Sequence, residues 1–538
     1  MVKQMRKMMN KGIIRAVSMA LVMILMLGSV AMTLTSCGKV EVDPINDNYR
    51  TFYQIFVGSF SDSNGDGIGD LRGIINRFDY LNDGNIHSGK SLGVQGIWLS
   101  PIFTSPSYHK YDAKNYYEID PKFGTMDDLK ELIALCKERN VKLILDLVIN
   151  HTSNKHPWFD ECKKARRNGD TTNKYYDYYT CVTANEQLGG KTYNFLSGIF
   201  YYECNFSSEM PELNFDNPDV KEEMLNLAKF YLDMGIDGFR FDAIKYIYYG
   251  DTAKSVEFWE WYMDELRAYK PDIYCVGECW SGETEILEYY GAMNCFNFAS
   301  SQAEGVVARA AKGSNISSFT NYIESYQDKV QAKNPDGMVM SFLSNHDMDR
   351  IAGTFSTENY MRMAANLYLL SPGSPMIYYG EEIGMRGSRG GEQTDANRRL
   401  AMLWGDKDTV KNPIGSTYKE SNQIDSSVKE QKRDKNSLYN YYCKLIAIRH
   451  KHPEIARGEY DSISCGNKNL GGFLVEYNGS YVVIIHNTST EQMSYDLAQC
   501  AALAGMSVSE LCDYIGVGEA NLNGTMLTIS GQTSVILK

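Results

Sequence analysis

The sequence is poor in features that mark metal-thiolate, redox and polyanion-binding proteins. Its 12 cysteines include no Cys-x-x-Cys pair, so a zinc or dithiol site has little support. Acidic residues outnumber basic ones by 67 to 54, and the net charge of −13 argues against nucleic acid as a partner. Beyond about residue 34, no apolar run reaches the length of a membrane span. These absences favour a globular protein with a single hydrophobic segment at its N-terminus.

That N-terminal segment has the pattern of a secretion signal. Five basic residues (Lys3, Arg6, Lys7, Lys11 and Arg15) precede an apolar run from Ala16 to about Leu34. The run ends in Leu34-Thr-Ser-Cys-Gly38, which resembles the cleavage box of bacterial lipoproteins and would make Cys37 the lipidated first residue. An uncleaved membrane anchor is the alternative. Both place the rest of the chain outside the cytoplasm, and the lipoprotein reading predicts a lipid anchor at the bacterial cell surface, with residues 38–48 as a linker.

Eleven cysteines follow Cys37, an odd number, so at least one is unpaired in the monomer that we expect. Cys162, Cys181 and Cys204 lie in one loop-rich stretch and could include a disulfide. Most of the others are interpreted as small buried hydrophobic residues.

Apolar strands alternate with helical patterns along most of the 538 residues, which predicts an α/β fold of parallel βα units closing into a (β/α)8 barrel. The candidate strands are Phe52–Val57, Val94–Leu99, Lys142–Ile149, Gly238–Asp242, Ile273–Glu278, Met293–Phe298, Met338–Leu343 and Pro375–Tyr379. We assign residues 49–151 and 214–453 to the barrel, and 152–213 to a loop-rich domain inserted after the third strand. Residues 454–538, with an Asn478-Gly479 hairpin turn, predict a C-terminal antiparallel β-sandwich.

Three stretches far apart in the chain each place an acidic residue at the end of an apolar run. They end in Asp242, Glu278 and Asp347. A parallel β/α barrel carries its catalytic groups at the carboxyl ends of its strands. Two carboxylates on either side of a glycosidic bond are the minimum requirement for glycoside hydrolysis. The pattern therefore predicts a glycoside hydrolase.

The neighbours of two of these acids suggest different roles. Asp242 lies two residues after Arg240 on one strand, so both side chains share a face and the guanidinium favours an ionised, nucleophilic carboxylate. Glu278 follows apolar Val276 and precedes Trp280, an environment that raises a carboxyl pKa and suits a proton donor. A retaining mechanism would place the two carboxyl groups roughly 5–5.5 Å apart. His151 and His346 are candidate partners for sugar hydroxyl groups.

A separate Gly-rich loop has the spacing of a calcium site. Oxygen ligands are available from the side chains of Asp62, Asn64, Asp66 and Asp70 and from the backbone of Ile68, while Gly67 permits the sharp turn. Position twelve is Gly73, so the loop only begins like an EF-hand. We interpret the ion as structural Ca²⁺, distant from catalysis; a polar turn without metal is the alternative.

These motifs together resemble glycoside hydrolase family 13, the α-amylase family. Four stretches, 146–151, 238–245, 277–280 and 342–347, look like its four signature regions in order, 210–214 is similar to its fifth region, and 373–382 looks like its last barrel strand. The resemblance implies Asp242 as nucleophile, Glu278 as proton donor and Asp347 as transition-state stabiliser. It further implies that Tyr111 stacks on the reacting glucose and that Asp112 pairs with Arg399. The family usually has Gly where Lys110 stands, which leaves the backbone there open.

Bond specificity is suggested by Lys245 and Trp280, which oligo-1,6-glucosidases of the family tend to lack. They favour an extracellular α-amylase acting on α-1,4 bonds of starch or maltooligosaccharides. Tyr246 replaces a usual His, and we predict no second calcium. The alternatives are an exo-acting α-glucosidase, an oligo-1,6-glucosidase or a transglycosylase on the same scaffold, and, from another class, a non-catalytic glucan-binding protein.

Overall fold

The computed structural model describes residues 47–538 apart from 86–87 and 392–393. The predicted signal segment and Cys37 lie outside the described residues. Within the described residues, no helix is both long and apolar enough to cross a membrane. The eleven cysteines after Cys37 are all unbridged, including the three for which a disulfide was considered, and Cys162 Sγ instead donates to the carbonyl oxygen of Tyr176 at 3.6 Å.

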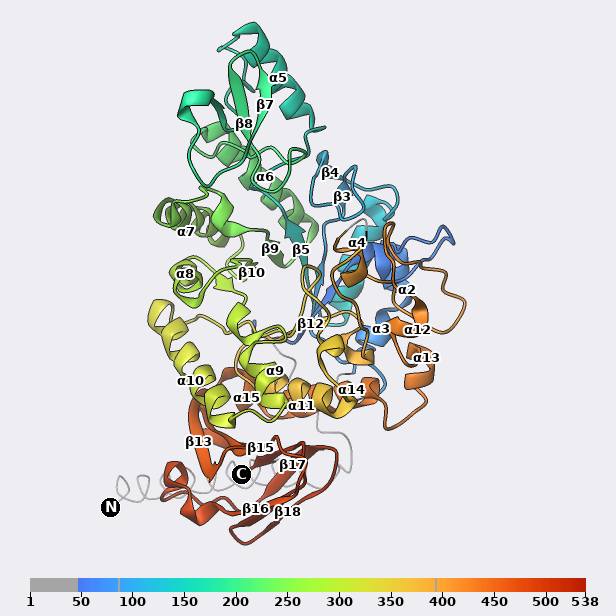
Figure 1. Cartoon of the computed structure of the whole chain (residues 1–538), viewed down its shortest axis with the longest axis vertical. Helices are drawn as coiled ribbons and strands as arrows, with labels where there is room; N and C mark the ends of the chain where they lie inside the picture. Colours follow the sequence, from blue (N-terminus) through green and yellow to red (C-terminus); the bar gives the residue numbers. More distant parts are fainter. Residues whose placement is uncertain (1–46, 86–87, 392–393) are drawn as a thin grey trace, which may run out of the picture. The chain divides into compact units, whose positions relative to one another are not determined.

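A parallel sheet lies at the centre of the fold (Figure 1). Its strands are β1 (Phe52–Ile55), β2 (Gly96–Leu99), β5 (Lys142–Leu147), β9 (Gly238–Phe241), β10 (Tyr274–Gly277), β11 (Asn294–Cys295) and β12 (Met376–Tyr378), in the order β11-β10-β9-β5-β2-β1-β12. All its neighbouring strands pair in parallel. The strands are buried along their whole length except at the first residue of β5 and of β11, which explains their nearly continuous apolar sequences. The predicted (β/α)8 barrel is confirmed.

The seventh strand position of the barrel differs from the prediction. Met338–Leu343 was expected to be a strand, but only two isolated parallel bridges form there, Phe296↔Met340 and Phe342↔Met376. Both neighbouring strands are short, with two and three residues, so the ladder has little partner backbone to extend along. These two bridges nevertheless close the ring between β11 and β12.

Helices cover the outside of the barrel (Figure 1). They are α2 (Leu71–Asn76), α3 (Phe78–Leu81), α4 (Met126–Glu138), α6 (Pro218–Met234), α7 (Thr252–Tyr269), α8 (Glu283–Glu288), α9 (Val306–Ala311), α10 (Ile316–Lys333), α11 (Glu358–Leu369), α12 (Glu420–Gln423), α13 (Val428–Gln431), α14 (Leu438–Lys451) and α15 (Pro453–Arg457). Local sequence sets several of their ends. Thr125 and Asp128 form a capping box at the start of α4, and α6 ends at Gly235 in the left-handed conformation.

The segment between β5 and α6 carries its own secondary structure. Helix α5 (Pro157–Asn168) is followed by an antiparallel sheet of β6 (Cys181–Thr183), β8 (Phe200–Glu203) and β7 (Tyr193–Ser197). A two-stranded ladder of β3 (Phe103–Thr104) and β4 (Asn115–Ile119) holds the loop that contains residues 105–114. Both segments contribute residues to the cleft described below.

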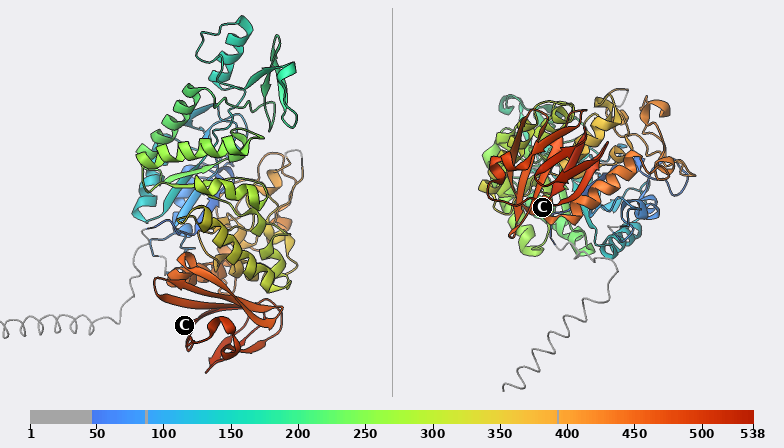
Figure 2. Two further views of the ribbon diagram at one scale, coloured as in Figure 1. Left: turned by 90° about the vertical axis from the view of Figure 1, so that its left-hand side faces the viewer. Right: turned by 90° about the horizontal axis from the view of Figure 1, so that it is seen from below.

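The C-terminal region is antiparallel, as expected (Figure 2). One sheet has the order β13 (Glu459–Asn467), β14 (Leu470–Tyr477), β15 (Ser480–Asn487), β20 (Thr533–Leu537) and β17 (Leu511–Gly516), and the other β16 (Met493–Asp496), β19 (Met526–Ile529) and β18 (Ala520–Asn523). Side chains from both sheets, such as Val483 and Leu527, share a separate apolar core. Asn478 and Gly479 have φ of 51° and 77°, as the predicted hairpin turn requires.

Candidate active site

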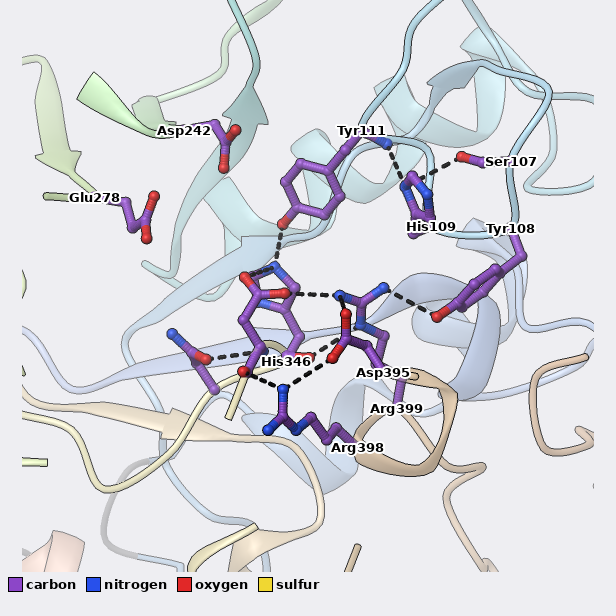
Figure 3. Close-up of polar contacts among 12 residues, drawn as sticks. Ser107, Tyr108, His109, Tyr111, Asp242, Glu278, His346, Asp395, Arg398 and Arg399 are labelled. Carbon is purple, nitrogen blue, oxygen red and sulfur yellow. Dashed lines mark hydrogen bonds and ion pairs between the residues drawn. The ribbon is translucent and has the colours of Figure 1, made fainter. Parts of the chain in front are cut away.

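The three predicted catalytic carboxyl groups meet in one cleft of about 490 Å³. Asp242 follows β9, Glu278 follows β10, and Asp347 follows the segment that closes the barrel. Parallel strands bring their carboxyl ends to the same edge, which is why residues more than 100 positions apart converge. Figure 3 shows Asp242 and Glu278 on one side of this site and Arg399 on the other.

Arg240 connects the acids beneath the cleft. Its side chain is fully buried, and Nη1 lies 2.8 Å from Oδ1 of Asp146 and 2.6 Å from Oδ1 of Asp242. Its Nη2 lies 3.6 Å from Oε2 of Glu278. Burial alone would lower the pKa of Arg240, but Asp146 and Asp242 raise it above its usual value, so the guanidinium stays charged. One fixed cation therefore orients three carboxyl groups.

Asp146 has a supporting position that the sequence did not reveal. Its carboxyl group is buried under the cleft and accepts hydrogen bonds from Trp98 Nε1 at 3.2 Å and Tyr111 Oη at 2.8 Å, besides that from Arg240. Burial raises its pKa to about 7, against the effect of Arg240. Its place at the end of β5, in the first signature region, was the only sequence signal. It fixes Arg240 and Tyr111 relative to each other.

Glu278 is in a setting that favours a protonated carboxyl group. It is 8 % exposed, and burial raises its pKa to about 7, with further increases from Asp242 and Asp347, although Arg240 opposes them. Its Oε2 accepts a hydrogen bond from the backbone N–H of Ala243 at 2.9 Å. The predicted 5–5.5 Å separation from Asp242 stays a prediction.

Asp347 is in the opposite setting. Its Oδ1 accepts a hydrogen bond from Arg399 Nη2 at 2.7 Å, and its Oδ2 lies 3.0 Å from His346 Nε2. Burial would raise the pKa of Asp347, but His346 and Arg399 together hold it far below its usual value. Asn345 Oδ1 accepts from the backbone N–H of Asp347 at 2.9 Å and fixes the turn. Asp347 is therefore a permanent carboxylate.

Tyr111 and His346 form a parallel stack at the floor of the cleft. Their ring centroids are 5.2 Å apart with an angle of 4° between planes. Tyr111 Oη lies 2.5 Å from His346 Nε2, and Gln54 Nε2 lies 2.7 Å from His346 Nδ1. Tyr111 lines the cleft, and its predicted stacking on a glucose ring stays a prediction, whereas His346 is completely buried behind it. His346 therefore orients Tyr111 and Asp347; the structure gives it no surface toward a sugar.

The predicted pair between Asp112 and Arg399 does not form. Asp112 is 2 % exposed, and its Oδ1 accepts hydrogen bonds from the hydroxyl groups of Ser105 and Ser107. Arg399 turns instead to Asp347 and to the carbonyl oxygen of His346, at 3.0 Å. The two serine hydroxyl groups already provide hydrogen bonds to the Asp112 carboxylate, which explains why it does not pair with the guanidinium of Arg399.

The backbone conformation at Lys110, where the family usually has Gly, is left-handed. It has φ of 69°, the left-handed conformation that a glycine would adopt without strain. Its buried Nζ lies 2.6 Å from Asp120 Oδ2 and donates to the carbonyl oxygen of Ser105 at 3.2 Å. The ion pair and hydrogen bond hold a conformation that costs about 1–2 kcal/mol for a non-glycine residue.

His151 lines the cleft with one free nitrogen. Its Nε2 lies 3.1 Å from the carbonyl oxygen of Tyr111, while its Nδ1 is buried and has no protein partner. Burial lowers its pKa, so the ring is neutral. This nitrogen is buried, so the predicted contact of His151 with a sugar hydroxyl group stays a prediction.

A smaller recess of about 210 Å³ adjoins the cleft on the Glu278 side. Lys245 and Trp280 line it, and Lys245 Nζ donates to the carbonyl oxygen of Trp280 at 2.8 Å. Trp280 and Phe206 are each 43 % exposed. Nothing in the sequence marked Phe206, which comes from the segment between β5 and α6.

Residues at the other end of the cleft were also missed. Tyr108 Oη accepts from Arg399 Nη1 at 3.1 Å, and His109 Nδ1 accepts from the backbone N–H of Tyr111 at 3.2 Å. Arg398 donates to the backbone oxygen of Asp347 at 2.7 Å and pairs with Asp395 at 2.8 Å. Their positions next to Tyr111 and Arg399 in the sequence were the only indication that they could line the cleft.

The predicted calcium loop is tightly turned on itself. Asp62 Oδ1 accepts from the N–H groups of Asn64 and Gly65, and its Oδ2 from Gly67 N–H at 2.7 Å and Thr409 Oγ1 at 2.6 Å. Asn64, Asp66 and Asp70 also accept backbone N–H groups. Throughout the described ranges, no three His, Cys, Asp or Glu side chains converge as metal ligands. Oxygen atoms are the ligands that Ca²⁺ prefers, but these side chains accept backbone N–H groups instead of converging, so the calcium site stays a prediction.

Comparison with known proteins identifies the family. The family model "Alpha amylase, catalytic domain" matches residues 54–458. The chain belongs to the α-amylase family of glycoside hydrolases. It is 36 % identical to Alpha-amylase 3 of Dictyoglomus thermophilum, over 83 % of this chain and 86 % of that protein. It is 31 % identical to an oligo-1,6-glucosidase of Bacillus cereus, over 83 % and 91 %. The solved structure of Eubacterium rectale Amy13B matches with a TM-score of 0.84 and 35 % identity, over 92 % and 97 %. The chain is therefore an enzyme of the hydrolase and transglycosylase class.

Proposed function

We propose that this protein is a retaining α-amylase that cleaves α-1,4-glucosidic bonds in starch and maltooligosaccharides outside the cell. The observation that carries the proposal is the meeting of Asp242, Glu278 and Asp347 in one cleft, with Oδ1 of Asp242 2.6 Å from the Arg240 guanidinium. Burial raises the pKa of Glu278 to about 7, which suits a proton donor. A glycosidase of this kind needs one acid that gives a proton and one carboxylate that forms a covalent bond.

Asp242 attacks the anomeric carbon while Glu278 protonates the leaving oxygen. Nη1 of Arg240 lies 2.6 Å from Oδ1 of Asp242 and pairs with its negative charge, and the attack uses the other oxygen, Oδ2. Asp347, held by Arg399, stabilises the positive charge that develops on the sugar ring. Glu278 then removes a proton from water, which releases the sugar from Asp242 with the original α-configuration.

Substrate contacts follow from the surfaces on either side of Glu278. Tyr111 and His151 line the cleft, and Lys245 and Trp280 line the recess that adjoins it at Glu278. An exposed indole suits stacking on a pyranose ring. The sequence of this recess supports α-1,4 specificity.

An exo-acting α-glucosidase or oligo-1,6-glucosidase is the second candidate. Tyr108, Arg398, Arg399 and Asp395 gather at one end of the cleft, where they would limit its extension past the first sugar. The oligo-1,6-glucosidase relative supports this alternative. A transglycosylase would share the same covalent step.

Two further proposals concern the scaffold and its location. The loop of Asp62, Asn64, Asp66, Ile68 and Asp70 binds a structural Ca²⁺, supported by its oxygen donors. Lipidated Cys37 anchors the protein at the outer face of the bacterial membrane, supported by the N-terminal pattern alone. A Cys37→Ser protein should then be released into the medium, and cell fractionation with an immunoblot tests this.

Product analysis tests the proposed function. The soluble protein, started after Cys37, is incubated with amylose, pullulan and isomaltose. A ladder of maltooligosaccharides from amylose, initially in the α-anomer by NMR and with isomaltose intact, supports an endo-acting α-amylase. Glucose alone, or cleavage of isomaltose, favours the second candidate.

Substitution of the proposed acid separates an enzyme from a binding protein. Glu278→Gln should reduce kcat on starch by about 10²–10⁴-fold, because the leaving oxygen loses its proton donor. Wild-type rates in this variant would refute the assignment, and no product from the unmodified protein would revive a non-catalytic glucan-binding role.

A further inference from the structure

Ala243, between the two proposed catalytic acids in the structure, has an unusual backbone. It follows Asp242 directly and has φ of 44° and ψ of 51°, the left-handed region that residues with a Cβ rarely adopt. Its side chain is 5 % exposed and forms part of the wall shared by the cleft and the recess. Strain that persists at such a place indicates that the surrounding contacts hold it.

Three hydrogen bonds connect the backbone around Ala243 to Glu278. The Ala243 N–H donates to Oε2 of Glu278 at 2.9 Å, and the next N–H, of Ile244, donates to the backbone oxygen of Glu278 at 3.0 Å. In return, Glu278 N–H donates to the carbonyl oxygen of Phe241 at 2.9 Å. The turn after β9 therefore binds both the backbone and the carboxyl group of Glu278.

The two oxygens of Glu278 are therefore not equivalent. Oε2 faces the Ala243 N–H and, at 3.6 Å, Nη2 of Arg240. A protonated carboxyl group donates through its hydroxyl oxygen and accepts through its carbonyl oxygen. An oxygen that accepts a backbone N–H and lies toward a guanidinium is the accepting one. The other charged groups around this carboxyl group are Asp242 and Asp347, and both favour its protonated form.

We propose that the Asp242–Ala243 peptide, held by the left-handed conformation of Ala243, is the positioning group that makes Oε2 of Glu278 the acceptor and Oε1 the oxygen that carries the transferred proton. The proposal rests on the proposed role of Glu278. As the glycosidic C1–O bond breaks, its electron pair stays on the leaving oxygen, which takes the proton from Oε1 while C1 bonds to Asp242. The Ala243 N–H then stabilises the new carboxylate.

A backbone ester tests this directly. Replacing Ala243 by lactic acid through nonsense suppression converts its N–H to an oxygen and keeps the methyl group. Because the lost hydrogen bond stabilises the ionised carboxyl group, the basic limb of the kcat/KM profile should move upward by about one pH unit. On maltotetraose, kcat should fall about tenfold with KM changed less than about twofold, since the N–H orients the acid rather than the substrate.

Ile244 provides the matched control. Its N–H binds the same residue but at the backbone oxygen, so the corresponding α-hydroxy acid at position 244 removes an equivalent hydrogen bond that does not touch the carboxyl group. We expect this ester to leave the basic limb in place. Ala243→Gly, which keeps the N–H, should also leave it in place. An equal shift in both esters, or none in the Ala243 ester, would overturn the proposal.

A neutron structure of the unmodified protein gives an independent result if the ester fails to fold. In crystals grown below pH 6, a deuteron on Oε1 supports the proposal and a deuteron on Oε2 refutes it. If Glu278→Gln retained full activity, the proposed function of Glu278 would fail instead, and that outcome is distinct from an unmoved pH limb.

Discussion

The two ends of the cleft treat a carboxyl group in opposite ways. At one end, Asp347 accepts from Arg399 and His346, and these partners lower its pKa far below the usual range. At the other, Glu278 has one backbone N–H at 2.9 Å and Arg240 at 3.6 Å, so burial dominates and raises its pKa to about 7. Asp347 is also the less buried of the two, with 32 % of its side chain exposed against 10 % for Glu278, so burial and neighbouring donors together separate the two acids.

At the Arg399 end of the cleft, the largest effect should come from removing the charge of Asp347. Asp347→Asn keeps the shape but cannot stabilise a positive sugar ring, so kcat/KM on maltotetraose should fall by about 10²–10³-fold. Steady-state kinetics at pH 6 measures this, with circular dichroism to check folding. A loss of less than about fivefold would contradict the proposed role of this carboxylate.

A smaller effect should follow when the same end loses its cation. Arg399→Met leaves His346 beside Asp347, and the pKa of Asp347 should rise because one of the two groups that lower it is gone. Ionised Asp347 would then be lost as the pH falls, so kcat/KM should drop about tenfold at pH 7 and further at pH 5. The pH profile of the variant checks this.

Arg398 is the matched control for that experiment. It lies beside Arg399, pairs with Asp349 and Asp395, and contacts Asp347 at the backbone oxygen rather than at the carboxyl group. Arg398→Met should therefore leave the acid limb of the profile where it is in the wild type. An acid limb that moves equally in both variants would show a general loss of structure at this end rather than an effect on Asp347.

Sequence patterns predicted the carboxylates but not their surroundings. Strand ends and signature stretches located Asp242, Glu278 and Asp347, because a parallel barrel fixes where each strand ends. The Asp112–Arg399 pair could not be tested that way, since the hydroxyl groups that satisfy Asp112 come from Ser105 and Ser107 in the same loop. Such a local choice among several hydrogen-bond partners leaves no periodic signal.

Long-range packing was similarly invisible. Phe206 reaches the recess from a segment without regular periodicity, and the short ladder at Met340 and Phe342 depends on the lengths of its neighbours. By contrast, the Asn478-Gly479 turn was predictable because its two backbone conformations are written in two adjacent residues. Information carried by neighbouring residues was readable, whereas information carried by distant partners was not.

Ionisation of Glu278 should lower the free energy of unfolding as the pH rises. Its folded pKa, about 7, lies above the unfolded value near 4.5, so the folded state binds the proton more tightly and loses stability between these two values. Glu278→Gln removes this cost. The unfolding free energy of the variant relative to wild type should increase from pH 4.5 to 7 and then level off, by about 3 kcal/mol at most.

Melting temperatures across this pH range measure the difference. Exposed Glu257 on α7 provides a control, because Glu257→Gln removes the same charge from a solvated surface. Its difference from wild type serves as the background against which the Glu278→Gln difference is compared. A difference for Glu278→Gln that stays flat from pH 4.5 to 8 would mean that burial does not raise the pKa of Glu278.

The smallest effect on catalysis should come from the calcium loop, which belongs to neither end of the cleft. If the loop binds Ca²⁺ as proposed, EDTA should lower the melting temperature by about 5 °C and leave kcat at 25 °C within about twofold, because the ion stabilises only the folded state.

Asp62→Asn should lower the melting temperature and abolish any further response to EDTA. Thr409→Val removes a hydrogen bond to Asp62 Oδ2 without removing an oxygen of the proposed site, so it should stay sensitive to EDTA. If Asp62→Asn and wild type respond equally to EDTA, the ion is bound elsewhere; if neither responds, the loop is stabilised by its own backbone hydrogen bonds.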